Sequence, residues 1–69
     1  MATDPVWMSR MLTEALKGLT VEERSALLLR DVERRSLDSV AAQLGCSSQN
    51  ARLYLAVGRI KLLKYFETQ

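Results

Sequence analysis

The sequence predicts an all-α fold with four helices. The 69-residue chain has a single proline, Pro5, so nothing after the first residues removes a backbone N–H from a helix. No stretch shows the apolar and polar alternation of β-branched residues that is typical of a strand. Residues that cap helices recur along the chain, with apolar residues at helical spacing between them.

The first helix is expected to begin with Asp4 as its N-cap and Pro5 at the first helical position, where the missing N–H costs nothing. Gly18 is the expected end of this helix. Trp7 is expected to pack on a neighbouring helix, and a ligand-stacking role is the weaker interpretation of a single tryptophan. The apolar stripe of this helix comprises Val6, Met8, Met11, Leu12, Ala15, Leu16 and Leu19.

The second helix opens with a capping box, in which Thr20 is the N-cap and Glu23 reaches back to it. The helix is expected to run to about Glu33, followed by a polar break at Arg34 and Arg35. Its inward candidates are Val21, Leu27, Leu28 and Val32.

The third helix is expected over residues 37–44, with Ser36 as its cap. Gly45 is expected to end it in the left-handed conformation that glycine tolerates best. One face of this helix carries Leu37, Val40, Ala41 and Leu44.

The fourth helix is expected from Ser48 to about Phe66, after a turn made by Cys46 and Ser47. Ser47 is expected to be its N-cap. Cys46 is most simply a small buried hydrophobic residue of the turn, because the chain has no histidine that could activate it as a nucleophile.

Together, the third and fourth helices meet the requirements of a helix-turn-helix motif over about residues 36–57. Ala41 is the small residue at the helix crossing, and Gly45 follows it by four positions. We therefore expect a single helix-turn-helix domain over residues 1–69. The apolar residues at the bracketing offsets are Val40, Leu44, Cys46, Ala51 and Tyr54.

Charge is unevenly distributed along the chain. Residues 1–35 hold six basic and six acidic side chains, whereas no acidic residue lies between Asp38 and Glu67. A half that carries only positive charge attracts polyanions, although a solubilising fringe of the last helix is the alternative. The basic residues of this half are Arg52, Arg59, Lys61 and Lys64.

Several classes of function are not expected. With no histidine and only Cys46, the chain has no nucleophile and base pair, no zinc ligand set and no intramolecular disulfide, so neither an enzyme nor a metal or cofactor site is predicted. The N-terminus does not resemble a signal peptide, and no apolar run approaches the ~20 residues of a membrane span. A cytoplasmic protein without membrane contact is expected.

The segment LKGLTVEERSALLLRDVERRSLDSVAAQLGCSSQNARLYLAVGRIKLL resembles region 4 of bacterial sigma factors, particularly the extracytoplasmic-function group. The similarity rests on LLLRDVE at residues 27–33, Ser36, VA at 40–41, LG at 44–45 and Ser47. It implies binding of the promoter −35 element through the second helix of the motif. It also implies docking on the flap of the RNA polymerase β subunit, and possible control by an anti-sigma factor.

The resemblance and the motif geometry together nominate residues for DNA contact. Gln49 or Asn50 could contact an adenine, and Arg52 a guanine or a phosphate. Alternatively, Gln49 and Asn50 serve only the N-terminus of the helix. The nominated DNA-binding residues are Ser47, Ser48, Gln49, Asn50, Arg52, Leu53 and Arg59.

The chain departs from the family pattern at three places. Arg34 and Arg35 replace the usual turn glycine before Ser36, and residues 50–51 (NA) replace a threonine-valine pair. Most of the family's arginines in the fourth helix are absent from residues 52–59, which read RLYLAVGR. Fewer phosphate contacts predict weaker DNA binding at physiological salt.

Apolar residues occupy more than one face of the fourth helix beyond Tyr54, which suggests a surface that another molecule covers. The alternative is that Leu53 and Val57 pack under the preceding helix and leave no surplus. The nominated partner-binding residues are Val57, Ile60, Leu63 and Phe66.

Three functions are therefore considered. The first is the DNA-binding domain of a sigma factor, which by resemblance would lack the region that melts promoters. The second is a protein-interaction module with weak or lost DNA binding, directed at the polymerase flap, an anti-sigma factor or a copy of itself. The third is a small dimeric repressor with the fourth helix as its dimer seam, for which half-site symmetry would be diagnostic.

Overall fold

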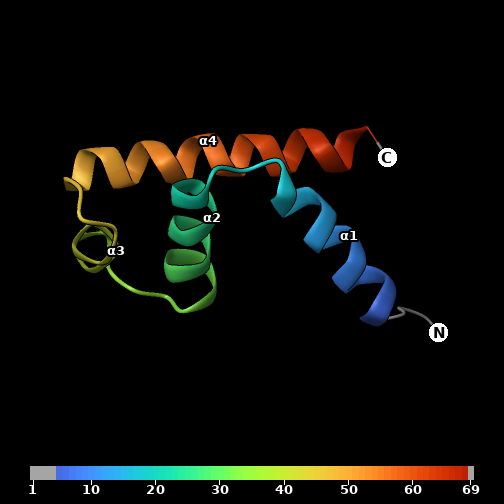
Figure 1. Cartoon of the computed structure of the whole chain (residues 1–69), viewed down its shortest axis with the longest axis horizontal. Coiled ribbons are helices and arrows are strands. Elements are labelled where there is room, and N and C mark those ends of the chain that lie inside the picture. The colour runs from blue at the N-terminus through green and yellow to red at the C-terminus, as the bar shows by residue number, and fades with distance from the viewer. Residues whose placement is uncertain (1–4, 69) are drawn as a thin grey trace.

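The computed structural model describes the backbone of residues 5–68 and the side chains of residues 10–68. These residues form helices and no strand, so the predicted all-α helix-turn-helix fold is confirmed. The longest helix, α4, lies along one side of the molecule, and the other helices pack beneath it (Figure 1). The elements are α1 (Pro5–Lys17), α2 (Val21–Leu27), the π-helical turn η1 (Leu28–Val32), α3 (Leu37–Leu44) and α4 (Ser48–Glu67).

Helix α1 packs on α4 through its C-terminal end and diverges from it toward the N-terminus (Figure 1). Ala15 and Leu19 are therefore buried, whereas Leu12, predicted to face inward, is 47% exposed because it lies beyond the contact. The predicted cap Asp4 lies outside the described residues, as do the side chains of residues 5–9, including the tryptophan.

Helix α2 begins with the predicted capping box. The Glu23 N–H donates to Thr20 Oγ1 at 3.1 Å, and the Thr20 N–H donates to Glu23 Oε1 at 3.0 Å. The helix does not continue to Glu33 as regular α-helix, because its last turn is the π-helical turn η1. In that turn the Glu33 N–H donates to the carbonyl of Leu28, five residues back, at 3.0 Å.

The predicted inward face of this segment is largely wrong. Only Leu27 is buried, whereas Val21, Leu28 and Val32 are 67%, 42% and 70% exposed. The physical reason is that α2 and η1 have neighbours on two sides, α4 and α3, so the buried residues do not follow one stripe. The residues buried here are Glu23, Ala26, Leu27 and Leu29.

The polar break between η1 and α3 contains a strained residue. Arg34 has a φ of 60°, and it is the only residue other than glycine with a positive φ among the described residues. It lies in the break where, by the resemblance, Arg34 and Arg35 replace a turn glycine. For a residue that carries a Cβ, this left-handed backbone conformation costs roughly 1–2 kcal/mol.

Helix α3 has the predicted bounds and caps. The Ser39 N–H donates to Ser36 Oγ at 3.1 Å, and Gly45 adopts the predicted left-handed conformation with φ 70° and ψ 36°. Val40 and Ala41 are buried against the rest of the core.

Helices α2 and α4 approach each other closely at Gly58. An ideal Cβ on Gly58 would lie 3.1 Å from Leu27 Cδ1 and 3.4 Å from Leu19 Cδ2. The absence of a side chain at this point of α4 lets Leu27 and Leu19 pack closely against the α4 backbone.

Candidate nucleic-acid interface

The first turns of α4 are held in place by the turn that precedes them. The Asn50 N–H donates to Ser47 Oγ at 3.1 Å, which confirms Ser47 as the N-cap. The Cys46 N–H donates to the carbonyl of Ala41 at 3.0 Å and closes the end of α3 around Gly45. This end of α4 lies beside α3 and extends beyond α2 (Figure 1).

Ser48 fixes α4 to α3. Its Oγ donates to Asp38 Oδ1 at 2.6 Å, and its side chain is half-buried. Of the nominated DNA-binding residues, Ser47 and Ser48 thus have roles inside the motif, Ser47 as the N-cap and Ser48 as the contact to α3.

Gln49, Asn50, Arg52 and Leu53 are exposed on the first two turns of α4. Within the described residues, the side chains of Gln49, Asn50 and Arg52 make no hydrogen bond or ion pair. Since Ser47 performs the capping, the Gln49 and Asn50 side chains are not engaged in holding the helix N-terminus. We call these four residues the α4 N-terminal cluster.

Arg59 does not belong to this cluster. It lies seven residues after Arg52, about 10 Å further along the helix axis. Its guanidinium makes two hydrogen bonds to Asp31 of η1, from Nη2 to Oδ1 at 2.6 Å and from Nε to Oδ2 at 3.2 Å. The hydrogen bond from Arg59 holds the pKa of Asp31 below its ordinary value of 3.8, so the two charges largely offset each other at neutral pH.

The nominated partner-binding residues are all exposed on α4. Val57, Ile60, Leu63 and Phe66 are 40%, 54%, 61% and 42% exposed. Phe66 differs from the others, because its ring packs edge-to-face on the neighbouring Tyr65 ring, with centroids 5.3 Å apart. Because Leu53 is 61% exposed, the alternative in which Leu53 and Val57 pack under α3 is wrong.

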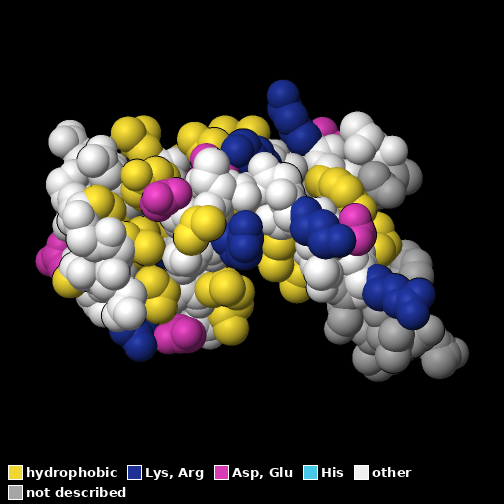
Figure 2. Space-filling model, viewed as in Figure 1, with side chains coloured by type: hydrophobic (Ala, Val, Ile, Leu, Met, Phe, Trp, Pro, Cys, Tyr) yellow, Lys and Arg dark blue, Asp and Glu magenta, His cyan; other side chains and the backbone are white. Residues whose placement is uncertain are grey.

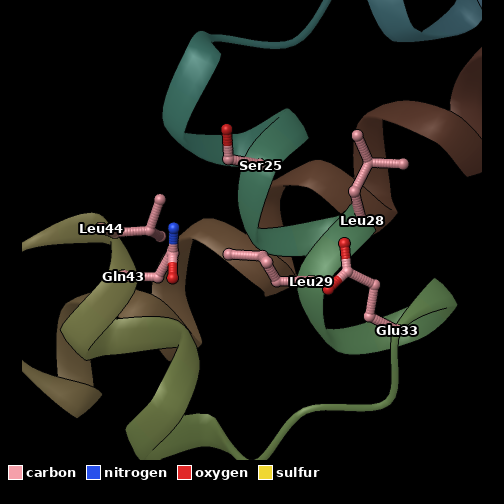
Figure 3. A pocket seen from close by; sticks show the side chains of 6 residues that line it. All are labelled: Ser25, Leu28, Leu29, Glu33, Gln43 and Leu44. Atoms are coloured by element: carbon pink, nitrogen blue, oxygen red, sulfur yellow. The ribbon is translucent and has the colours of Figure 1, made fainter.

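A second surface feature was not singled out from the sequence. An open cleft of about 300 Å³ lies between α2 with η1 on one side and α3 on the other (Figure 3). The available signal was the run of three leucines at residues 27–29, which cannot all face α4. The cleft is lined by Ser25, Leu28, Leu29, Glu33, Gln43 and Leu44.

The described part of the chain contains neither a candidate metal site nor a candidate membrane span. In that part, no group of acidic, cysteine or histidine side chains could hold a metal ion. None of the helices described there is both long and apolar enough to cross a membrane.

The capped second helix, the left-handed glycine and the exposed polar N-terminal cluster define a helix-turn-helix domain of the DNA-binding kind. The family model for sigma-70, region 4 matches residues 9–62, and the chain therefore belongs to this family. Members generally bind the −35 promoter element, and the family is a DNA-binding regulatory one, not a family of enzymes. No curated protein and no solved structure matched the chain.

Proposed function

We propose that this domain binds the −35 element for a sigma factor of the extracytoplasmic-function type, using the α4 N-terminal cluster, and docks on the RNA polymerase β-subunit flap. The observation that carries the proposal is the set of free polar side chains at the start of the second helix of the motif. In helix-turn-helix proteins this part of the second helix contacts base edges in the major groove.

The side chains of the cluster suit base contact. The Arg52 guanidinium can donate two hydrogen bonds to guanine O6 and N7, and the amides of Gln49 and Asn50 can pair with adenine N6 and N7. The backbone N–H groups at the start of α4 are suited to a phosphate, because the helix dipole favours negative charge there.

The affinity is expected to be low and the salt dependence shallow. Arg52 is the only cation in the cluster, and Arg59 would have to leave Asp31 before it could reach a phosphate. If one to three phosphates are neutralised, log K falls against log salt concentration with a slope of about −1 to −3.

Docking on the polymerase is supported by the cleft between α2, η1 and α3. Half of its lining residues are leucines, with Leu29 and Leu44 on opposite sides (Figure 3), and none of them belongs to the α4 N-terminal cluster. A protein segment could therefore occupy the cleft while the domain is bound to a duplex.

The proposal is tested by fluorescence anisotropy with a labelled −35-like duplex and a scrambled duplex over a series of salt concentrations. We expect preference for the −35-like duplex, and a loss of about 1–3 kcal/mol in binding free energy for Arg52→Ala if Arg52 contacts a base. Arg10→Ala, which removes an exposed arginine of α1, is the matched control and should have little effect. Equal binding of both duplexes, or equal effects of the two substitutions, would refute the proposal.

A further inference from the structure

The side of α4 that faces away from the core carries an apolar seam. We propose that this seam docks an acidic amphipathic helix of a partner protein. We call it the outer face of α4 and define it as Leu53, Ala56, Val57, Ile60 and Leu63. The inference goes beyond DNA binding and does not depend on it.

The spacing of the outer face is that of a helix-packing seam. Leu53, Ala56, Ile60 and Leu63 follow one another at intervals of three, four and three residues, which are the a and d positions of two heptads. Val57 lies at the adjoining e position. The seam is about 15 Å long from Leu53 to Leu63, enough for nearly three turns of a second helix.

The core of the domain does not use this seam. Ala51, Leu55 and Gly58 are the buried residues of α4, and they occupy the opposite side of the helix. On the outer face, Leu53, Ile60 and Leu63 are 61%, 54% and 61% exposed. Figure 2 shows hydrophobic side chains gathered along the edge of the molecule that α4 forms. A contiguous apolar surface on so small a domain marks a site that another molecule covers.

The edges of the seam carry three basic side chains, two of which have no carboxylate partner in the described part of the chain. Arg52 and Arg59 occupy the g positions on one edge, and Lys64 occupies the e position on the other. Within the described residues, Arg52 and Lys64 have no ion pair, and Arg59 remains 54% exposed although it pairs with Asp31. Charges at the e and g positions decide which helix is accepted as a partner.

This charge pattern disfavours a second copy of the chain as the occupant. A parallel pair would bring Arg59 of one copy beside Lys64 of the other, and an antiparallel pair would bring arginine beside arginine. Glutamate or aspartate at the matching positions of another helix would neutralise the same edges. The seam therefore fits an acidic helix with leucine-like residues at heptad spacing.

The test uses the full 69-residue chain and two labelled three-heptad peptides with leucine at a and d. One peptide has glutamate at all e and g positions and the other has lysine, so each repels its own copies. We expect the acidic peptide to bind, with an affinity that falls as salt is raised, and the basic peptide to bind at least tenfold more weakly. Replacing Arg52 and Lys64 together by glutamate should reverse this preference.

Substitutions within the seam provide the second arm. Ile60→Gln and Leu63→Gln should each weaken binding of the acidic peptide about tenfold, because each removes a large apolar contact. Val32→Gln is the matched control, since Val32 is an exposed apolar residue at 70% that lies outside the seam. Circular dichroism checks that all three variants remain folded.

Three outcomes would overturn the inference. The first is a failure of discrimination. Either the two peptides bind equally or not at all, or Ile60→Gln and Val32→Gln change the affinity for the acidic peptide by the same amount. The second is self-association of the domain in sedimentation equilibrium that Ile60→Gln abolishes, which would make a second copy the occupant. The third is loss of −35-like duplex binding in Ile60→Gln as large as in Arg52→Ala, which would make the seam a DNA surface.

Discussion

The carboxylate of Glu23 connects the start of α2 to α4, and its removal is a direct test of how the domain is held together. Glu23 Oε1 accepts a hydrogen bond from the Thr20 N–H at 3.0 Å and another from Lys61 Nζ at 2.7 Å. The Glu23 side chain is only 10% exposed, and the Lys61 side chain is 40% exposed. Glu23→Gln retains an oxygen for the cap but removes the charge.

The expected loss follows from this partial burial. A hydrogen bond to a charged group contributes about 1.5–3 kcal/mol when buried, and an exposed ion pair contributes about 0–1 kcal/mol. Because Lys61 is partly in water, we expect Glu23→Gln to lower the free energy of unfolding by about 1 kcal/mol, which corresponds to roughly 4–8 °C in Tm for a domain of this size. Glu23→Ala also loses the cap and should cost about 2 kcal/mol.

The contribution of Glu23 should also depend on pH. The hydrogen bond from Lys61, and then that from Thr20, lowers the pKa of Glu23 below its ordinary value of 4.5. Since the unfolded chain takes up a proton more readily than the folded one, the stabilisation is present above about pH 4.5 and is lost as the pH falls through the folded pKa. The difference between wild type and Glu23→Gln should therefore shrink in acid.

The assay is urea denaturation followed by circular dichroism, at neutral pH and at about pH 3. Wild type, Glu23→Gln, Lys61→Met and the double variant form a cycle whose coupling energy we expect to be about 1 kcal/mol at neutral pH. Glu22→Gln, which removes an exposed carboxylate from the same turn, is the control. The reasoning is refuted if Glu23→Gln behaves like Glu22→Gln, or if its deficit is unchanged in acid.

Three further predictions concern other residues. Arg34→Gly should stabilise the domain by about 0.5–1 kcal/mol in thermal melts, because glycine adopts a φ of 60° without strain and its entropic cost is smaller than the strain removed. Arg34→Ala, which keeps a Cβ, is the control and should not raise the stability. Gly58→Leu should destabilise by about 2–3 kcal/mol in urea titrations because it would displace Leu27, and a change below 0.5 kcal/mol would contradict the close approach. Asp31→Asn should release Arg59 and steepen the salt slope of duplex binding by about one, as measured by anisotropy, and an unchanged slope would show that Arg59 contacts no phosphate.

The helix boundaries could be predicted from the sequence because capping is a local interaction. Thr20, Ser36 and Ser47 each accept a hydrogen bond from a backbone N–H three residues later, so four consecutive residues contain the whole signal. The same holds for Gly45, whose left-handed conformation is required by the tight turn between α3 and α4.

The buried faces were harder to predict because they depend on how many neighbours an element has. Val21 and Val32 fit a helical stripe but are exposed to water. The charged residue Glu23 is buried, because its ion pair with Lys61, 38 residues away, offsets the cost of removing the carboxylate from water. The ion pair of Arg59 likewise depends on a carboxylate 28 residues earlier in the chain. Spacing along the sequence carries no information about either pairing.

For the candidate site, the sequence predicted which residues lie on α4 but not which are free. Polar residues at the start of a capped helix are exposed almost by necessity, so Gln49, Asn50 and Arg52 could be nominated from local pattern alone. The sequence could not show whether the Ser48 hydroxyl has a hydrogen-bond partner. That partner is Asp38 of α3, which comes within reach of Ser48 only when the turn between the two helices has formed.

The position of α4 in the chain has a consequence for synthesis. Helices α1, α2 and α3 all pack on α4, yet α4 is the last of the four to be made. On a ribosome, the first three helices are translated before the surface that buries their apolar residues exists. Stable folding must therefore wait until α4 has been synthesised and has left the ribosome, and until then Leu19, Leu27 and Val40 remain available to chaperones.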